Sequence, residues 1–229
     1  RRQFGDAALS RLPRDNPAVF LALGALLSYL HETQKTDLAH VDDLEYYRRG
    51  QFMELDLTAR RNLELTETLR GKEKKGSLLW VLDRTKTAMG GRMMRGWLER
   101  PLLSVTQIDR RSAAVSALVE HTVAREELIL ALQGVSDMER LVGRIVYGTA
   151  GGRDLASLRA AMERLPQLKT QLAAFDKGRL HRLNEALDDL SDLAALIGRT
   201  LVDEPPFSVR EGELIRDGFD PEVDRLRGI

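Results

Sequence analysis

Hydrophobic residues recur at alternating spacings of three and four over much of the chain, a pattern typical of amphipathic helices. One stretch carries Leu155, Leu158, Met162, Leu165, Leu168, Leu172 and Phe175, and the next carries Leu180, Leu183, Leu187, Leu190, Leu193, Ile197 and Leu201. Pro166 is expected to break or kink the first helix, and residues 176–178 supply a turn between the two. The simplest outcome is an antiparallel helical hairpin.

An apolar run over residues 18–30 predicts a helix near the start of the chain, from about Pro17 to Glu32. Proline is favoured at the first helical position because its missing N–H would have been unpaired there in any case. A membrane-spanning helix needs about 20 apolar residues, so this shorter run is interpreted as a helix buried in a protein core.

Two sequence pairs match capping boxes, Ser104 with Gln107 and Ser136 with Glu139. In such a box the serine oxygen and the glutamine or glutamate side chain each satisfy a backbone N–H that the first helical turn leaves unpaired. Pro101 ends the helix that precedes the first box. We therefore expect helices to begin after Ser104 and after Ser136.

Two short segments depart from the helical period. Residues 50–56 alternate between apolar and polar side chains, which predicts one strand, and residues 205–217 carry apolar residues separated by Gly212. Charged residues make up 31% of the chain and aromatic residues only 5%, which disfavours an all-β sandwich. The expected fold is therefore mainly α, a multi-helix bundle with a few short strands near residues 50–56 and 205–217.

Composition limits the possible environments and partners. Thirty-five basic residues balance thirty-five acidic ones, so any contact with nucleic acid must come from a local patch, and no membrane association is expected. The absence of cysteine excludes disulfides, thiolate metal sites and cysteine nucleophiles, and it favours a reducing cytoplasm. The chain starts at Arg1 without an initiator Met, and its last helix, from Pro221, has no stop before Ile229, so we expect an excised segment.

No catalytic, cofactor-binding or metal site is predicted. Residues 71–77 superficially resemble a phosphate-binding loop but lack the lysine after the second glycine, and the pairs Gly90-Gly91 and Gly151-Gly152 do not form a dinucleotide fingerprint. The histidines, which are His31, His40, His121 and His181, show no i, i+4 pairing that would suggest a metal site. Ser77, Ser104 and Ser136 are interpreted as helix caps rather than nucleophiles.

A local basic cluster is the only candidate for nucleic-acid contact. Its residues are Lys72, Lys74, Lys75, Arg92 and Arg95. Clustered cations gain affinity for phosphates through counterion release, although a solvated surface or intramolecular ion pairs are the commoner outcome. Trp80 and Trp97 have apolar neighbours and are interpreted as core anchors rather than base-stacking platforms.

Four ordered sequence blocks resemble the core domain of the bacterial MutS family of DNA mismatch-repair proteins. They are residues 52–65 (FMELDLTARRNLEL), 77–102 (with SLLWVLDRT and TAMGGRMMRGWLERPL), 137–141 (DMERL) and 153–159 (RDLASLR). The positions that the resemblance marks as structural are Asp56, Arg60, Arg61, Asn62, Leu63, Glu64, Leu82, Asp83, Thr85, Met89, Gly90, Arg92, Trp97, Leu98 and Pro101.

The resemblance implies a core, or lever, segment. Residues 1–16 would be the tail of a preceding connector domain and residues 17–229 the helical core, with residues 202–229 leading toward a DNA-gripping clamp. In the parent family, ATP and Mg²⁺ belong to a separate ATPase domain, so this segment is not expected to be an enzyme. The parent would act on DNA as a homodimer with a MutL-type partner, in the cytoplasm and on the nucleoid when bound to DNA.

The resemblance also implies a function, namely that the helices couple the ATPase to the clamp. The alternatives are an autonomous helical nucleic-acid-binding module and, less in keeping with the four blocks, a protein-interaction scaffold. Residues 50–54 imitate the family's Gly-x-Phe-x-Glu mismatch-probing motif, but they lead directly into the core-domain block. Phe52 is therefore interpreted as a packed strand residue whose replacement by alanine destabilises the fold.

Overall fold

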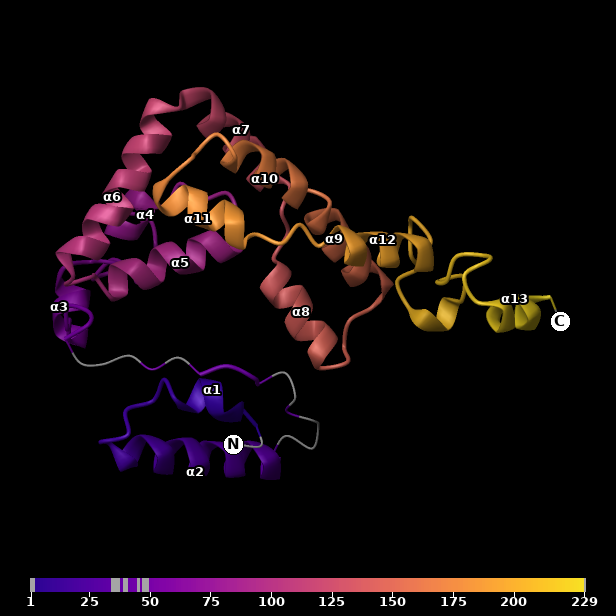
Figure 1. Ribbon diagram of the computed structural model, residues 1–229, viewed down its shortest axis with the longest axis horizontal. Helices are drawn as coiled ribbons and strands as arrows, with labels where there is room; N and C mark the ends of the chain where they lie inside the picture. The colour runs from indigo at the N-terminus through magenta and orange to yellow at the C-terminus, as the bar shows by residue number, and fades with distance from the viewer. Residues whose placement is uncertain (1–2, 34–37, 39–40, 45, 47–49, 229) are drawn as a thin grey trace. The chain divides into compact units, whose positions relative to one another are not determined.

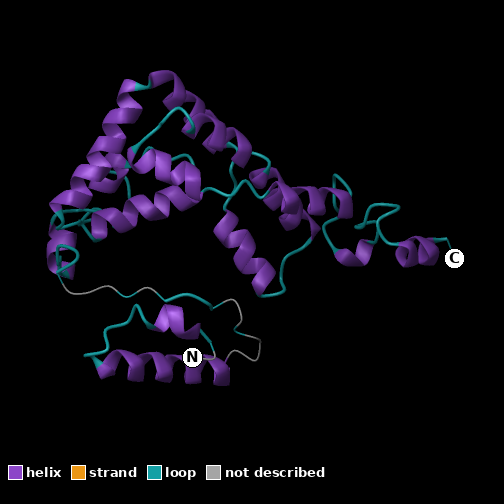
Figure 2. Ribbon diagram, in the orientation of Figure 1, coloured by secondary structure: helices purple, strands orange, loops and turns teal. Residues whose placement is uncertain are grey.

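The chain is mainly helical in the computed structural model, as the sequence predicts (Figures 1 and 2). The structure describes residues 3–33, 38, 41–44, 46 and 50–228. It divides into two compact units, Arg1–Gln51 and Phe52–Ile229. The boundary predicted between residues 16 and 17 concerns domains of a longer protein and stays a prediction. Within the described residues, no helix is long and apolar enough to cross a membrane.

The helices of the two units are bounded as follows. The first unit holds α1 (Gly5–Leu9) and α2 (Pro17–Thr33). The second holds α3 (Leu57–Asn62), α4 (Leu78–Leu82), α5 (Ala88–Glu99), α6 (Val105–Glu120), α7 (Thr122–Gln133), α8 (Met138–Val146), α9 (Gly152–Met162), α10 (Leu165–Leu172), α11 (Gly178–Ala186), α12 (Ser191–Thr200), the 3₁₀ turn η1 (Val209–Glu211) and α13 (Pro221–Arg227).

Helix α2 forms where the sequence predicts it, but its predicted burial is wrong. None of its residues is buried, and the side chains of Leu21 and Tyr29 are 74% and 62% exposed. Hydrophobic composition predicts that a helix can be buried, whereas burial itself requires a partner surface that covers the helix. The buried side chains near α1 are those of Phe4, Ala8 and Leu12.

The core of the second unit lies where the two long apolar stretches pack together. Helix α9 packs against α12 and α10 against α11, the nested order of an antiparallel hairpin, while α7 covers α10 and α6 covers α11. The buried cluster contains Leu128, Ala131, Val135, Leu158, Ala161, Met162, Leu165, Leu168, Phe175, Leu180 and Ala194. The predicted hairpin is therefore confirmed.

Each arm of the hairpin is two helices rather than one. Pro166 lies in the first turn of α10, so the predicted break in the first arm is confirmed. The second arm also breaks, between Ala186 and Ser191, where Leu190 adopts a left-handed backbone with φ of 50°. Asp188 and Asp189 accept hydrogen bonds from the backbone N–H groups of Leu190 and Ser191 at 3.0 and 3.1 Å. These local bonds compete with the helical ones and account for the break.

Both predicted capping boxes are wrong in detail. Helix α6 begins after Ser104, but the Ser104 side chain accepts no capping hydrogen bond. Ser136 donates instead to the carbonyl oxygen of Ser157 at 3.1 Å, and Asp137 caps α8 by accepting from the N–H of Arg140 at 3.2 Å. Asp137 rather than Ser136 caps α8 because it lies directly before the first helical residue. Its carboxylate is also charged, so it interacts favourably with the positive end of the α8 helix dipole.

The described residues contain two isolated β-bridges in place of the two predicted strands. Phe52 pairs with Leu102 in an antiparallel bridge, supported by the Met53 N–H, which donates to the Pro101 carbonyl at 2.8 Å. Leu201 pairs in the same way with Ile215. Each bridge ties a connecting segment to the end of a helix and does not extend into a ladder.

Candidate coupling site between helices α5 and α8

Asp83 organises the turn between α4 and α5. Its Oδ1 accepts hydrogen bonds from the Thr85 N–H at 3.1 Å and the Thr85 hydroxyl at 2.6 Å. Its Oδ2 accepts from Lys74 Nζ at 2.6 Å. The hydrogen bond from Lys74, followed by that from the Thr85 side chain, lowers the pKa of Asp83 from 3.8 to about 2. The Asp83 carboxylate thus links the polar loop of residues 71–76 to the turn that precedes α5.

The first turn of α5 is closely packed at Gly90. Thr87 caps the helix by accepting a hydrogen bond from the Gly90 N–H at 3.0 Å. A Cβ atom on Gly90 would lie 3.1 Å from Thr87 Oγ1 and 3.2 Å from Thr85 Cβ. These distances are tighter than ordinary van der Waals contact, so a larger residue at position 90 would require the threonines to shift by a few tenths of an ångström.

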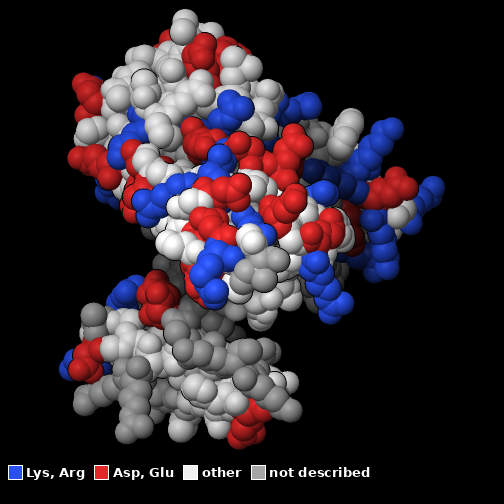
Figure 3. Space-filling view, turned by 90° about the vertical axis from the view of Figure 1, so that its right-hand side faces the viewer, with Lys and Arg blue, Asp and Glu red and all other residues white. Residues whose placement is uncertain are grey.

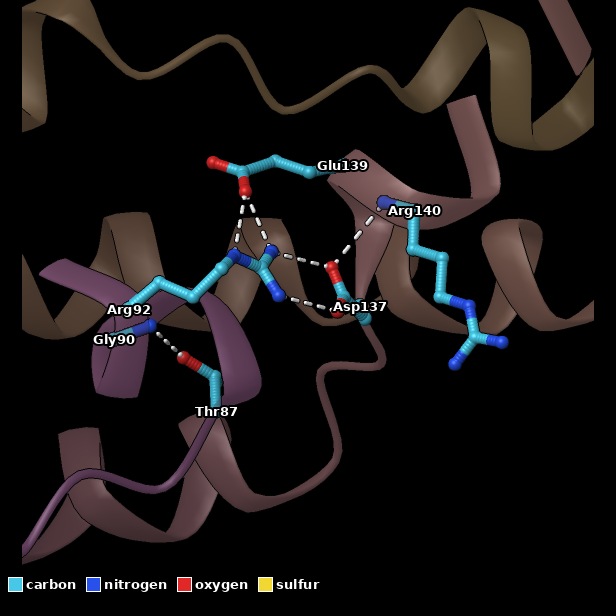
Figure 4. Close-up of polar contacts among 6 residues, drawn as sticks. All are labelled: Thr87, Gly90, Arg92, Asp137, Glu139 and Arg140. Carbon is cyan, nitrogen blue, oxygen red and sulfur yellow. Dashed lines mark hydrogen bonds and ion pairs between the residues drawn. The ribbon is translucent and has the colours of Figure 1, made fainter. Parts of the chain in front are cut away.

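Arg92, one half-turn further along α5, links this helix to the start of α8 (Figure 4). Its two terminal nitrogens donate to the two oxygens of Asp137 at 2.7 and 2.8 Å, and its Nε donates to Glu139 at 3.1 Å. Asp137 at the same time caps α8 through the Arg140 N–H. We call Arg92, Asp137 and Glu139 the α5–α8 junction. Such two-pronged pairing fixes relative orientation as well as distance, because guanidinium and carboxylate are both planar.

The two carboxylates of the junction are unequal partners. The Asp137 side chain is 20% exposed and that of Glu139 is 68% exposed. The hydrogen bonds from Arg92 lower the pKa of Asp137 to about 2, and in return the Asp137 and Glu139 carboxylates raise the pKa of Arg92. Solvent screens an exposed ion pair, so Asp137 rather than Glu139 is the principal anchor of Arg92.

Further ion pairs connect α8 to the segments that follow it. Arg144 on α8 pairs with Asp154 on α9 at 3.1 Å, and Asp154 also accepts from the Gly151 N–H at 2.8 Å. Asp203, after α12, pairs with Arg159 on α9 at 3.6 Å and with Arg216 at 2.8 Å. A series of ion pairs therefore connects consecutive elements, from the loop before α4 to the segment after α12.

Most of the predicted DNA-contacting cations are engaged within the chain. Lys74 pairs with Asp83, Arg92 lies in the junction, and Arg95 pairs with Glu99 one turn along the same helix at 3.0 Å. Lys72 and Lys75 are exposed in the loop of residues 71–76. The space-filling view, which shows one face, has basic and acidic side chains interleaved (Figure 3). The structure thus gives no support for a DNA-binding patch made of these five residues.

The first block of predicted structural residues forms the start and end of α3. Asp56 caps the helix by accepting from the Ala59 N–H at 2.6 Å, and Arg60 Nε donates to the Leu55 carbonyl at 2.9 Å. Glu64, with φ of 47°, accepts from the Leu69 N–H at 2.7 Å. The remaining members of the block are exposed, namely Arg61, Asn62 and Leu63.

The predicted core anchors are wrong for both tryptophans. Trp80 is 48% exposed and Trp97 is 37% exposed. The guanidinium carbon of Arg111 lies 3.7 Å from the centre of the Trp97 ring, which is a cation–π contact. Of the other positions, Leu82 is exposed, Leu98 and Pro101 are half-buried, and Met89 packs against the core.

The roles of Asp137 and Glu139 as partners of Arg92 were not predicted. They are separated from Arg92 by 45 and 47 residues, and no local spacing rule links residues so distant. Among the described residues, no group of three or more His, Asp or Glu side chains is arranged to hold a metal ion. His40 falls outside the described residues.

Comparison with known proteins agrees with the sequence blocks. The family model described as MutS domain III matches residues 58–226. The chain is 48% identical over 225 residues to the DNA mismatch repair protein MutS of Desulforamulus reducens, covering 98% of this chain and 26% of that protein. It is 49% identical to the protein of the same name from Brevibacillus brevis over 90% of this chain and 24% of that protein. For the Symbiobacterium thermophilum protein the identity is 46%, over 99% and 26% of the two chains.

The chain thus spans about a quarter of the length of these curated relatives. The family match extends over all the helices from α5 to α12 and contains the whole α5–α8 junction. On this match, and on the relatives that align with nearly its entire length, the chain belongs to the MutS family and corresponds to domain III of that family.

Proposed function

We propose that this chain is the mechanical connector of a DNA mismatch-repair protein, coupling an ATPase domain elsewhere in the protein to a clamp that grips DNA. Packed helices suit this task because close-packed interfaces move between discrete arrangements instead of deforming continuously. A movement of the helices at one end of such a bundle can therefore be transmitted to the other end.

The observation that carries the proposal is the two-pronged hold of Arg92 on Asp137. Helices α5 and α8 are far apart in sequence, and the bond joins the first turns of α5 to the capping residue of α8. A rotation of α5 would pull on the cap of α8, and the Arg144–Asp154 pair would pass that displacement to α9. The junction is thus well placed to keep the helices moving as one body.

The partners that this proposal requires are those of the longer protein. ATP and Mg²⁺ would bind in the ATPase domain, DNA in the clamp and the mismatch-reading domain, and a second copy and a MutL-type protein would complete the assembly, which would work on the nucleoid. The connector itself would hydrolyse nothing. We therefore expect the 229-residue chain to release no inorganic phosphate from ATP in the presence of Mg²⁺, and Mg²⁺-dependent hydrolysis by this chain alone would contradict the assignment.

The decisive experiment uses the complete protein with Arg92→Gln, which keeps most of the side-chain volume and removes the charge. ATP hydrolysis and mismatch affinity without nucleotide should change little, while the acceleration of DNA release by ATP should fall by about fivefold or more, the lower range of measured allosteric couplings. Arg95→Gln is the matched control, since it lies on the same helix and breaks only an ion pair within α5.

A charge swap provides the second arm of this experiment. Arg92→Asp combined with Asp137→Arg restores opposite charges at the junction, so it should recover part of the coupling that either single change removes. If folded Arg92→Gln protein keeps the full effect of ATP on DNA release, the junction does not carry coupling and the proposal fails.

A further inference from the structure

Four arginines line one open groove between α6 and α11, helices that pack side by side (Figure 1). The lining residues are Gln107, Arg110, Arg111, Arg179, Arg182 and Leu183, and the groove has a volume of about 320 Å³. We call it the four-arginine groove. On each helix the lining residues are spaced i, i+3 and i+4, so they share one face of α6 and one face of α11.

The groove holds positive charge without matching negative charge. No carboxylate lines it, and within the described part of the chain none of its four arginines forms an ion pair. Several arginines elsewhere on this chain do have acidic partners, so the groove differs from them in gathering four arginines without one among the described residues. Those with acidic partners include Arg92, Arg95, Arg144, Arg159, Arg216, Arg225 and Arg227. The nearest acid along α11, Glu185, is directed to His181 at 3.4 Å.

Two of these cations are held close together. Arg111 is half-buried and stacked on the Trp97 ring, which restricts its guanidinium, and its pKa is lowered by burial and then by the positive charge of Arg179. Arg179 itself stands in the first turn of α11, which contains no acidic residue and where the helix dipole adds further positive potential. Like charges gathered in this way repel one another, and a bound anion would relieve that repulsion.

We propose that the four-arginine groove is a binding site for phosphate groups. Guanidinium is planar and presents paired N–H donors that match two oxygens of a phosphate, which is why arginine is favoured over lysine where phosphate is recognised. The phosphate can belong to the backbone of a nucleic acid or to a free phosphate compound, and both would present the same oxygens. This site is separate from the α5–α8 junction and does not depend on the connector role.

The primary test uses the 229-residue chain with inorganic pyrophosphate at low ionic strength, followed by calorimetry and by the NMR signals of the arginine Nε–Hε groups. Saturable binding that shifts signals of the groove arginines is expected, and it should weaken as salt is added. A double change of the exposed pair, Arg110→Gln with Arg182→Gln, should weaken binding by roughly tenfold or more, because each removes charge-assisted hydrogen bonds.

Arg225→Gln is the matched control, since Arg225 is an exposed arginine outside the groove and pairs with Glu222 on α13. It should leave pyrophosphate affinity unchanged. Circular dichroism and thermal unfolding verify that the double variant is folded, and the NMR experiment on the unaltered chain needs no variant. Equal loss in Arg225→Gln, or pyrophosphate binding that shifts only signals outside the groove, overturns the proposal.

A second titration with duplex DNA identifies the source of the phosphate. Competition between DNA and pyrophosphate for the same arginine signals assigns the groove to a nucleic-acid backbone. Pyrophosphate binding without such competition assigns it to free phosphate compounds. If neither pyrophosphate nor duplex DNA binds saturably at low ionic strength, the groove is not a phosphate site.

Discussion

Gly152 and Leu214 are in direct contact, with the Leu214 side chain occupying the space that a β-carbon on Gly152 would need. Such a β-carbon would also lie 2.8 Å from Pro205 Cβ. Gly152 is a buried residue that begins α9, so this contact packs the segment after α12 directly onto the start of α9. The absence of a side chain at residue 152 is therefore what allows these two parts of the chain to meet.

Gly152→Ala should accordingly destabilise the chain. Forcing extra volume into a packed contact typically costs about 1 to 3 kcal/mol. The measurement is chemical denaturation of the two proteins side by side. Gly143→Ala within α8 is the control, because a β-carbon there meets nothing within 4 Å, and a helical Gly-to-Ala change in open space should stabilise by about 0.5 to 1 kcal/mol. Equal effects of the two changes would show that packing at Gly152 is unimportant.

The geometry of the α5–α8 junction predicts a favourable interaction free energy between Arg92 and Asp137. A double-mutant cycle with Arg92→Gln and Asp137→Asn should give a favourable coupling free energy, because the pair is two-pronged and Asp137 is the less exposed partner. The same cycle on Arg95 and Glu99 should give a smaller coupling, as expected of an ion pair within one exposed helix. A larger coupling for Arg95 and Glu99 would contradict the role assigned to the junction.

The helices themselves were largely predictable from sequence. The hairpin core follows from the spacing of apolar residues, and the break before α10 follows from Pro166, since both depend on the local chain alone. Burial of a whole face was less predictable. The runs containing Trp80 and Trp97, and all of α2, have core-like compositions, yet their exposure depends on whether another element covers them.

The candidate site was predictable only in part. The sequence blocks pointed to Asp83, Thr85, Gly90 and Arg92 as structural positions, and these do lie together around the start of α5. What local rules could not supply was the partner of Arg92, because Asp137 is brought to it by tertiary folding. The four-arginine groove was missed for the same reason, since it joins one face of α6 to one face of α11.

Acid should weaken the contacts made by Asp83 and Asp137. Both carboxyl groups have a pKa of about 2 in the folded chain against an ordinary value of 3.8, so the folded state favours their charged forms. Their contribution to stability is thus complete above about pH 4 and is lost as the pH falls toward 2. Denaturation measured between these pH values should show a weaker pH dependence for Asp83→Asn and Asp137→Asn than for the unaltered chain.

The control for this pH experiment is the Arg92→Gln background. Asp137 owes its lowered pKa first to Arg92 and then to the Arg140 N–H, so adding Asp137→Asn to Arg92→Gln should change the pH dependence less than it does in the unaltered chain. A full additional effect would mean that Arg92 is not the main cause of the lowered pKa of Asp137. The Asp83→Asn change should stay effective in the same background, because its partners are Lys74 and Thr85.

Phe52 tests whether the motif over residues 50–54 serves packing or mismatch recognition. Its side chain is half-buried, and its bridge to Leu102 is flanked by the Met53–Pro101 hydrogen bond at 2.8 Å. A fully buried phenylalanine costs about 3 to 5 kcal/mol when cut to alanine. For half of that burial we expect Phe52→Ala to destabilise the chain by about 1 to 2 kcal/mol in chemical denaturation.

Phe207→Ala is the matched control for Phe52→Ala, because Phe207 is 80% exposed and its removal should stay within about 0.5 kcal/mol. In the complete protein, Phe52→Ala should leave the affinity for mismatched duplex DNA unchanged at a temperature where the protein is folded. Replacing a packing residue lowers mismatch binding only by lowering the fraction of protein that is folded. Replacing a residue that stacks on a mispaired base lowers the affinity even when all of the protein is folded. Loss of mismatch affinity in a Phe52→Ala protein of unaltered stability would therefore assign Phe52 to recognition and refute its packing role.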